Sequence, residues 1–301
     1  MTKNLFDVII IGGSYAGLAA GMTLGRALKN VLIIDNRKPC NRQTPQSHNF
    51  LTNDGKTPGE IALLAIQQVQ VYKTVQLLEE TAIHAGRVEK GFEIHVSNGE
   101  RFQSKKLLFA TGIKDLLPGI AGISESWGIS VLHCPYCHGY EVRNEATGIL
   151  SDGDAGFEFA RLISNWTTDL TLFTNGTSTL TDNQREELAA HSIQVIEKEI
   201  EKIEHTGGHV DKIIFKDRTK TPIAAIYVQS FFEQHCKIPE ALGCELTEEG
   251  YIRTDNVHET TVPGVYAIGD NASKTRTVAN AVAAGASAGI VISKKIIVEE
   301  W

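Results

Sequence analysis

The chain has 301 residues, of which 42% are hydrophobic and 22% charged, and its formal net charge at pH 7 is −7. This length allows one large or two ordinary domains, and the acidic balance argues against a nucleic-acid partner, which needs a basic stripe. The N-terminus lacks the basic segment of a signal peptide. The longest unbroken apolar runs fall short of the roughly 20 residues of a membrane span, so we expect no membrane partner and a cytoplasmic protein.

The first recognisable element is a strand–turn–helix–strand unit in residues 6–36. A buried strand over 8–11 meets a glycine turn, a helix of small residues covers about 16–28, and a second strand over 31–34 ends in an acid. This order, with the acid about 20 residues past the turn, is typical of a βαβ unit that binds a dinucleotide.

Each residue of that turn has a physical role in such a unit. Gly12 permits the tight turn, the small Ser14 lets the backbone approach a pyrophosphate, and Gly17 lets helix and strand pack closely. The pyrophosphate would rest at the helix N-terminus, where free N–H groups favour negative charge. Asp35 would accept hydrogen bonds from the adenosine ribose. The unit departs from the G-x-G-x-x-G pattern at Ser14, where glycine is usual.

Further along the chain, "KKLLFATG" predicts a strand closed by Ala110-Thr111-Gly112, and a Pro-Gly linker follows. A second strand–turn–helix–strand pattern covers residues 147–173, with the turn Ser-Asp-Gly-Asp-Ala-Gly at 151–156. Near the C-terminus, the strand in "TTVPGVYAIGDNAS" runs into Gly269-Asp270, before a helix of small residues. An aspartate at that position suits a polyol hydroxyl such as that of a ribitol.

The stretch "LHCPYCHGYEVRN", residues 132–144, permits three interpretations. C-x-x-C-H is the attachment signature of a c-type haem, but that chemistry belongs to exported proteins. A structural zinc site needs four ligands, and no second cysteine pair exists, although a site that also uses His133 or His138 stays open. The third interpretation, a redox-active pair of Cys134 and Cys137, is favoured.

Together these segments resemble the low-molecular-weight thioredoxin reductase family over nearly the whole chain. The resemblance implies an α/β fold of two Rossmann-like three-layer domains. It implies a discontinuous FAD-binding domain of residues 1–113 and 240–301. An inserted NAD(P)-binding-like domain of residues 114–239 would carry the C-x-x-C pair. It also implies a homodimer.

Around the cysteines, "CPYCHGYEVRN" and "CNRQTPQSHNFLTNDGKTPGEI" resemble the subgroup that includes the gliotoxin- and holomycin-type dithiol oxidases. His138 stands where ordinary thioredoxin reductases have aspartate. The resemblance implies that Cys137 lies nearer the flavin, that Cys134 meets the substrate, and that His138 carries the proton. The cofactor-binding residues implied in the same way are Gly12, Gly13, Ser14, Ala16, Gly17, Asp35, Asn49, Gly112, Gly269, Asp270 and Ala279.

The second turn departs from the family pattern, which has a G-x-G-x-x-[GA] loop for NADPH. Ser151 replaces the first glycine, and Asp152 and Asp154 would repel a pyrophosphate. The following strand end, "LFTNGTST", has no cation for a 2′-phosphate. The sequence therefore predicts no tight binding of NADPH and leaves weak use of NADH open.

These observations favour a FAD-dependent dithiol/disulfide oxidoreductase that acts on a small dithiol or disulfide, or on a thioredoxin-like protein, in the direction of dithiol oxidation. Three alternatives stay open: an NADPH-dependent thioredoxin or disulfide reductase, a flavin-binding redox sensor without turnover, and a zinc-binding interaction module.

Overall fold

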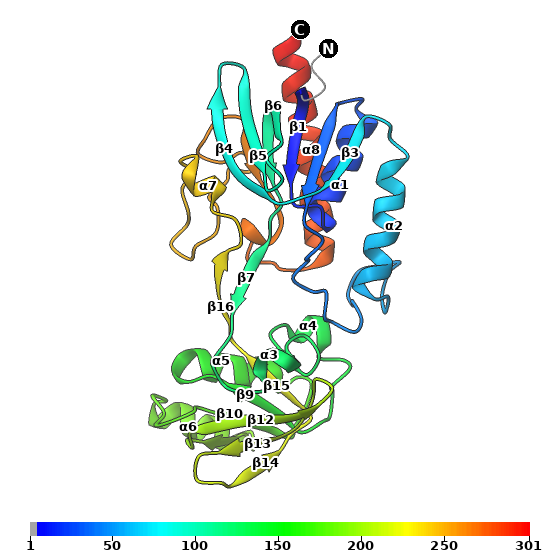
Figure 1. The fold of residues 1–301 in the computed structure, drawn as a ribbon. Coiled ribbons are helices and arrows are strands. Elements are labelled where there is room, and N and C mark those ends of the chain that lie inside the picture. Colours follow the sequence, from blue (N-terminus) through cyan, green and yellow to red (C-terminus); the bar gives the residue numbers. More distant parts are fainter. Residues whose placement is uncertain (1–4) are drawn as a thin grey trace. The chain divides into compact units, whose positions relative to one another are not determined.

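The computed structural model describes residues 5–301, which divide into two compact units (Figure 1). The first unit comprises the described chain up to Arg42, together with Asn49–Lys114 and Phe232–Trp301. The second comprises Gln43–His48 and Asp115–Phe231. Where the chain passes between the units, strands β7 (Ile113–Leu116) and β16 (Phe231–Gln234) pair in a two-stranded sheet.

The first unit is built on a seven-stranded sheet in the order β3-β2-β1-β6-β5-β4, with β17 also paired to β6. The neighbours β3, β2, β1, β6 and β17 run parallel, whereas β4 and β5 form an antiparallel extension. Its strands are β1 (Leu5–Ile11), β2 (Val31–Asp35), β3 (Val75–Glu79), β4 (Ala82–Val88), β5 (Gly91–Val96), β6 (Arg101–Phe109) and β17 (Val265–Ala267). Its helices are α1 (Tyr15–Arg26), α2 (Pro58–Gln70), α7 (Ile238–Ala241), the 3-10 turn η1 (Gly269–Asn271) and α8 (Val278–Glu300).

The strand–turn–helix–strand unit predicted for residues 6–36 is confirmed as β1, α1 and β2. Strands β1 and β2 are buried apolar runs, as expected for central parallel strands with both faces covered. Helix α1 ends at Arg26, two residues earlier than the sequence indicates, and Leu28 takes a left-handed conformation with φ 59°.

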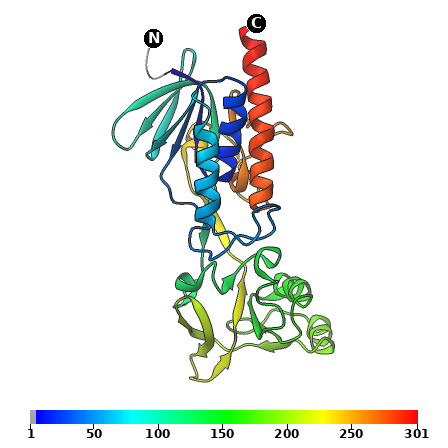
Figure 2. The ribbon, with the colours of Figure 1, turned by 90° about the vertical axis from the view of Figure 1, so that its right-hand side faces the viewer.

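Helices α1, α2 and α8 run side by side in Figure 2, and α1 packs closely on α8. Small residues make that approach possible, because a Cβ atom added at Gly285 would lie 2.2 Å from the carbonyl oxygen of Ala16. Helix α8 has the length and apolar composition to cross a membrane, because it has 23 residues and contains an 18-residue window with a mean hydropathy of 1.6, of which 33% is buried. Core helices of globular proteins share this property, and α8 here buries its glycine face against α1.

The second unit contains a parallel five-stranded sheet, β11-β10-β9-β15-β8, and an antiparallel three-stranded sheet, β12-β13-β14. Its strands are β8 (Val131–Leu132), β9 (Thr147–Leu150), β10 (Leu170–Phe173), β11 (Gln194–Ile196), β12 (Ile200–Thr206), β13 (His209–Phe215), β14 (Lys220–Pro222) and β15 (Ala225–Val228). Its helices are α3 (Ile123–Ser126), α4 (Pro135–His138), α5 (Gly153–Ile163) and α6 (Asp182–Ala190). The second predicted strand–turn–helix–strand pattern, at residues 147–173, is confirmed as β9, α5 and β10.

Candidate functional site

The turn between β1 and α1 leaves no room for side chains at its glycines. Gly12 has φ +103°, and a Cβ atom there would lie 2.2 Å from the carbonyl oxygen of Ala110. A Cβ atom at Gly17 would lie 1.9 Å from the carbonyl oxygen of Gly12, and one at Gly13 would lie 2.8 Å from the Cβ of Asp35. The backbone of the turn is therefore held between the end of β6, the first turn of α1 and the end of β2.

The first turn of α1 presents backbone N–H groups that the helix itself does not use. Ser14 is the N-cap with an extended backbone, and its side chain makes no capping hydrogen bond. At this end of the helix, the N–H of Leu18 donates a hydrogen bond to the carbonyl of Ser14 at 2.9 Å. Ala16 is buried, and Gly269 approaches it so closely that a Cβ atom on Gly269 would lie 3.3 Å from that of Ala16. Such a helix end suits an anion like a pyrophosphate.

Asp35, at the end of β2, connects the turn to the next loop. Its carboxylate accepts hydrogen bonds from the N–H groups of Gly13 at 2.6 Å and Arg37 at 2.8 Å. A carboxylate has about four lone-pair directions, so two remain for a hydroxyl ligand. The role predicted for Asp35 toward a ribose stays a prediction, but its bracing of the turn is a second role that the sequence analysis missed.

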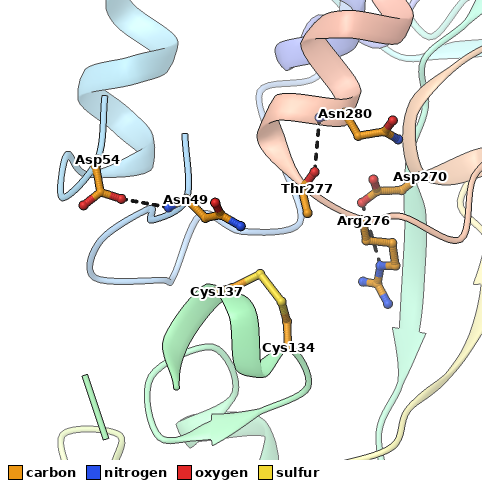
Figure 3. The surroundings of a disulfide bond; sticks show 8 residues. All are labelled: Asn49, Asp54, Cys134, Cys137, Asp270, Arg276, Thr277 and Asn280. Atoms are coloured by element: carbon orange, nitrogen blue, oxygen red, sulfur yellow. Dashed lines mark hydrogen bonds and ion pairs between the residues drawn. A yellow bond between two sulfur atoms is a disulfide. The ribbon is translucent and has the colours of Figure 1, made fainter. Parts of the chain in front are cut away.

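The C-terminal part of the first unit contributes the segment Gly269–Asn271, which follows β17 after the single residue Ile268. Gly269 has φ +78°, and the carboxylate of Asp270 pairs with Arg276 at 3.8 Å (Figure 3). Asn271 is fully buried and donates from Nδ2 to the carbonyl of Phe109 and to the hydroxyl of Thr111, both at 3.1 Å. Its Oδ1 has no hydrogen-bond partner among the residues that the structure describes.

Sequence reasoning missed Asn271 and Arg276. Asn271 follows the predicted Gly-Asp pair directly, and Arg276 precedes the last helix. Their position along the chain was therefore the only sequence feature that could have indicated them. Neither residue type in a loop reports its own burial, and that of Asn271 comes from packing against the end of β6.

The remaining residues predicted to contact a cofactor lie at turns of the first unit. Ala279 is in the first turn of α8, whose N-cap Thr277 accepts the N–H of Asn280 at 3.1 Å (Figure 3). Asn49 has a left-handed backbone with φ 59°, stabilised by donation from its N–H to Asp54 at 2.8 Å. Gly112 also has a positive φ of 63°, in the short turn between β6 and β7.

These features fit a dinucleotide with a polyol chain, such as FAD. The glycine turn at the start of α1 offers close backbone approach and free amides for a pyrophosphate. The buried Oδ1 of Asn271 is a hydrogen-bond acceptor without a donor, and such a group is costly to leave unpaired. The residues that would hold the cofactor therefore lie at the carboxyl ends of β1, β2, β6 and β17, where ligands of open α/β sheets bind.

In the second unit, Cys134 and Cys137 form a disulfide, with a Cα–Cα distance of 5.3 Å (Figure 3). Cys134 precedes the single-turn helix α4, and its carbonyl accepts the N–H groups of Cys137 and His138 at 3.2 Å. Tyr136, between the two cysteines, is exposed, and its ring meets Trp166 edge-on at 5.5 Å. The pair is thus held in an oxidised C-x-x-C turn with an aromatic surface beside it.

His138 is the last residue of α4. Burial lowers the pKa of His138, the carboxylate of Glu141 opposes that effect, and His48 adds to it. His48 Nε2 lies 3.5 Å from Glu141 Oε1. His133 stacks on Trp127, with ring centroids 5.4 Å apart. Because burial disfavours the charged imidazolium, the pKa of His138 lies below its usual range and the ring is held in the neutral form that can accept a proton.

The acidic turn between β9 and α5 is closed by hydrogen bonds from the loop after β10. The carboxylate of Asp152 accepts the hydroxyls of Ser178 and Thr179, both at 2.7 Å, and the N–H of Thr179 at 2.9 Å. Asp154 accepts the side-chain amide of Gln184 at 2.7 Å. Burial acts to raise the pKa of Asp152, but the hydrogen bonds from Thr179 and Ser178 outweigh it and hold that pKa below its usual range.

Comparison with known proteins identifies the family. Residues 6–285 match the pyridine nucleotide-disulphide oxidoreductase family. The chain belongs to this family.

Individual relatives agree with that assignment. Thioredoxin reductase tcpT of Claviceps purpurea is 29% identical over 99% of this chain and 96% of its own length. A putative thioredoxin reductase TrxB from Bacillus anthracis has a TM-score of 0.94 and 30% identity, covering 98% of this chain and 100% of its own. An oxidoreductase from Agrobacterium tumefaciens has a TM-score of 0.91 and 37% identity, covering 97% of this chain and 99% of its own.

The α/β thioredoxin reductase fold predicted from the sequence is therefore confirmed. The chain is a thioredoxin reductase-like oxidoreductase of a family that acts on disulfides, and FAD is the cofactor of these enzymes.

Proposed function

We propose that this protein is a FAD-dependent dithiol oxidase that works without tightly bound NADPH. Two observations together carry the proposal. Cys134 and Cys137 form a disulfide, and in the second nucleotide turn the carboxylates of Asp152 and Asp154 accept hydrogen bonds from neighbouring residues of the protein. On this proposal the first unit binds FAD through the residues at its strand ends, and the second unit carries the redox pair.

Electrostatics and space both argue against NADPH at the second turn. Two carboxylates lie where a pyrophosphate would rest, and like charges at about 4 Å repel by about 1 kcal/mol in water and more where solvent is scarce. Ser178 and Thr179 also donate hydrogen bonds to Asp152, so these side chains lie against the turn that a pyrophosphate would have to enter. Residues 171–181 contain no lysine, arginine or histidine to pair with a 2′-phosphate.

The proposed reaction begins with a dithiol substrate that loses one thiol proton to His138. The substrate thiolate attacks the sulfur of Cys134, the bond to Cys137 breaks, and Cys137 leaves as a thiolate. The second substrate thiol, deprotonated in turn, attacks the substrate sulfur of the mixed disulfide and releases Cys134. The substrate leaves as a disulfide, and two electrons and two protons remain with the cysteine pair, His138 and solvent. FAD, when bound, supplies the two-electron relay from the reduced pair to oxygen.

The substrate class follows from the reactive group. A small dithiol fits a half-buried C-x-x-C turn with Trp166 and the exposed Tyr136 beside it, and a thioredoxin-like protein with a reduced pair is the second candidate. We also propose that the protein acts in the cytoplasm.

A homodimer is part of the proposal. Large apolar side chains are exposed on α8 of the first unit, among them Ile290, Ile297 and Val298. Light scattering of the purified protein should give twice the mass of 32.9 kDa, and a single-chain mass would contradict the dimer.

The experiment is to mix purified holoprotein with dithiothreitol under air, and separately with NADPH or NADH, while following the flavin absorbance and peroxide. We expect bleaching and peroxide with the dithiol and slow or no bleaching with NADPH. The Cys134→Ser variant, with an unaltered first unit, should retain the flavin and lose the dithiol reaction. Rapid bleaching by NADPH would instead favour a pyridine-nucleotide reductase, and bleaching without turnover would favour a redox sensor.

A further inference from the structure

The connection between β2 and α2 reaches into the second unit. Its residues 43–48 belong to that unit, although the chain on both sides belongs to the first. Gln43 anchors the segment by donating from Nε2 to the carbonyl of Trp127 at 3.0 Å. Thr44 packs against Gly128, where an added Cβ atom would lie 3.0 Å from the hydroxyl oxygen of Thr44. The segment is buried at Ser47 and ends at His48.

His48 meets a carboxylate that follows the redox motif. Its Nε2 lies 3.5 Å from Oε1 of Glu141, which comes three residues after His138. The His48 side chain is 17% exposed and that of Glu141 is 37% exposed, so solvent screens this pair only in part. The carboxylate of Glu141 thus pairs with His48, and both residues act electrostatically on His138, three residues before Glu141 in the chain.

A fourth ionisable group faces the same carboxylate. Tyr227, on β15, is 1% exposed, and its hydroxyl has no hydrogen-bond partner among the described residues. Burial, with the charge of Glu141 as a second cause, raises the pKa of Tyr227, so this hydroxyl stays protonated. The charges that act on His138 are accordingly those of Glu141 and His48, while Tyr227 stays neutral beside them.

We propose that Glu141 and His48 are positioning residues for His138, such that Glu141 acts on the His138 ring and His48 competes for the same carboxylate. The inference rests on the proposed role of His138 as the proton acceptor. Glu141 stabilises the imidazolium that forms when His138 takes the proton of a substrate thiol, and His48 weakens that stabilisation by pairing with the carboxylate. No bond changes at either residue. The proton moves from the substrate sulfur to the His138 ring and from there to a cysteine thiolate or to solvent.

This arrangement predicts two variants with effects of opposite sign. Glu141→Gln removes the negative charge, lowers the pKa of His138 and moves the pH midpoint of disulfide opening downward. His48→Gln removes the imidazole that pairs with Glu141 and leaves that carboxylate free to act on His138, so it moves the midpoint upward. At a fixed pH on the rising limb, each rate constant should change by about two- to tenfold, the order expected for one charge a few ångströms away in partly solvated surroundings.

The measurement uses holoprotein and does not depend on flavin turnover. Opening of Cys134–Cys137 by dithiothreitol is quenched by alkylation at set times and counted by mass spectrometry, from pH 5 to pH 8. The ionisation of dithiothreitol is common to all variants and cancels in the comparison. Glu145→Gln is the matched control, because Glu145 is an exposed glutamate in the same loop whose charge does not act on His138.

Midpoints displaced in opposite directions, with the control at the wild-type value, support the inference. Displacement in the same direction, or slower opening at every pH with an unmoved midpoint, would overturn it in favour of a purely structural role. NMR titration of the His138 ring, assigned with His138→Gln, gives the same two signs independently. Opposite displacements in a protein that turns over no dithiol under air would instead count against the proposed oxidase function alone.

Discussion

Replacing Gly17 by alanine should disrupt the first dinucleotide turn. The added Cβ atom would lie 1.9 Å from the carbonyl oxygen of Gly12, about 1.1 Å short of the 3.0 Å that such contacts require. That oxygen cannot move away freely, because Gly12 is itself held against the carbonyl of Ala110, 2.2 Å from where its own Cβ would be. Overpacking of this kind costs about 1–3 kcal/mol, and contact with constrained backbone places Gly17→Ala near the upper end.

The assay combines thermal unfolding with flavin content. A cost of about 3 kcal/mol corresponds to a decrease in Tm of roughly 6–12 °C for a unit of this size. The displaced turn should also lower the ratio of flavin to protein absorbance in the purified variant. Both readouts come from the same preparation, so a loss of flavin without a loss of stability is visible.

Gly59→Ala is the matched control. Gly59 lies in the first turn of α2, as Gly17 lies in that of α1, but its Cβ would have no neighbour nearer than Thr57 Oγ1 at 4.0 Å. Alanine there gains about 0.5–1 kcal/mol of helix stability, so Tm should stay level or rise. If Gly17→Ala kept the wild-type Tm and flavin content, the steric reasoning about the turn would be wrong.

Three further substitutions test other contacts. Asn271→Leu removes both hydrogen bonds that the side chain donates at the end of β6. We expect the free energy of unfolding, measured with denaturant, to fall by about 1–3 kcal/mol and the flavin to be retained more weakly. An unchanged denaturation midpoint would contradict the role of the buried amide. Lys295→Met removes the partner of Glu259, whose pKa is held below its usual range because hydrogen bonds from Lys295 and Gly264 outweigh burial. That pairing stabilises the protein above the unfolded-state pKa of about 4.3, and its contribution is lost as the pH falls through the lower folded-state pKa. The variant should therefore be less stable than the wild type at pH 7 and lose less stability on acidification. Equal acid sensitivity of the two proteins in scanning calorimetry would refute this. Asp152→Ala removes the acceptor for Ser178 and Thr179, and amide exchange in residues 176–180 should become faster, whereas unchanged protection would show that other contacts hold this loop.

The sequence alone determined the secondary structure around both turns. Glycines, small residues and continuous apolar runs act locally, because close packing and strand burial impose their own residue types at fixed spacing. The chemistry of Cys134 and Cys137 was readable for the same reason, since three-residue spacing places two sulfurs within bonding distance in a single turn. These features need no knowledge of distant contacts.

Only the tertiary structure decided which groups meet. The pairing of His48 with Glu141, 93 positions apart, depends on a crossover segment that joins the other unit. The burial of Asn271 depends on β17 lying beside β6, and the closure of the acidic turn depends on the loop after β10 returning to Asp152. Serine, threonine, asparagine and histidine occur in loops for many reasons, so their identity does not specify a partner. The partner is set by long-range packing, which places a donor beside an acceptor and removes the water that would otherwise satisfy both.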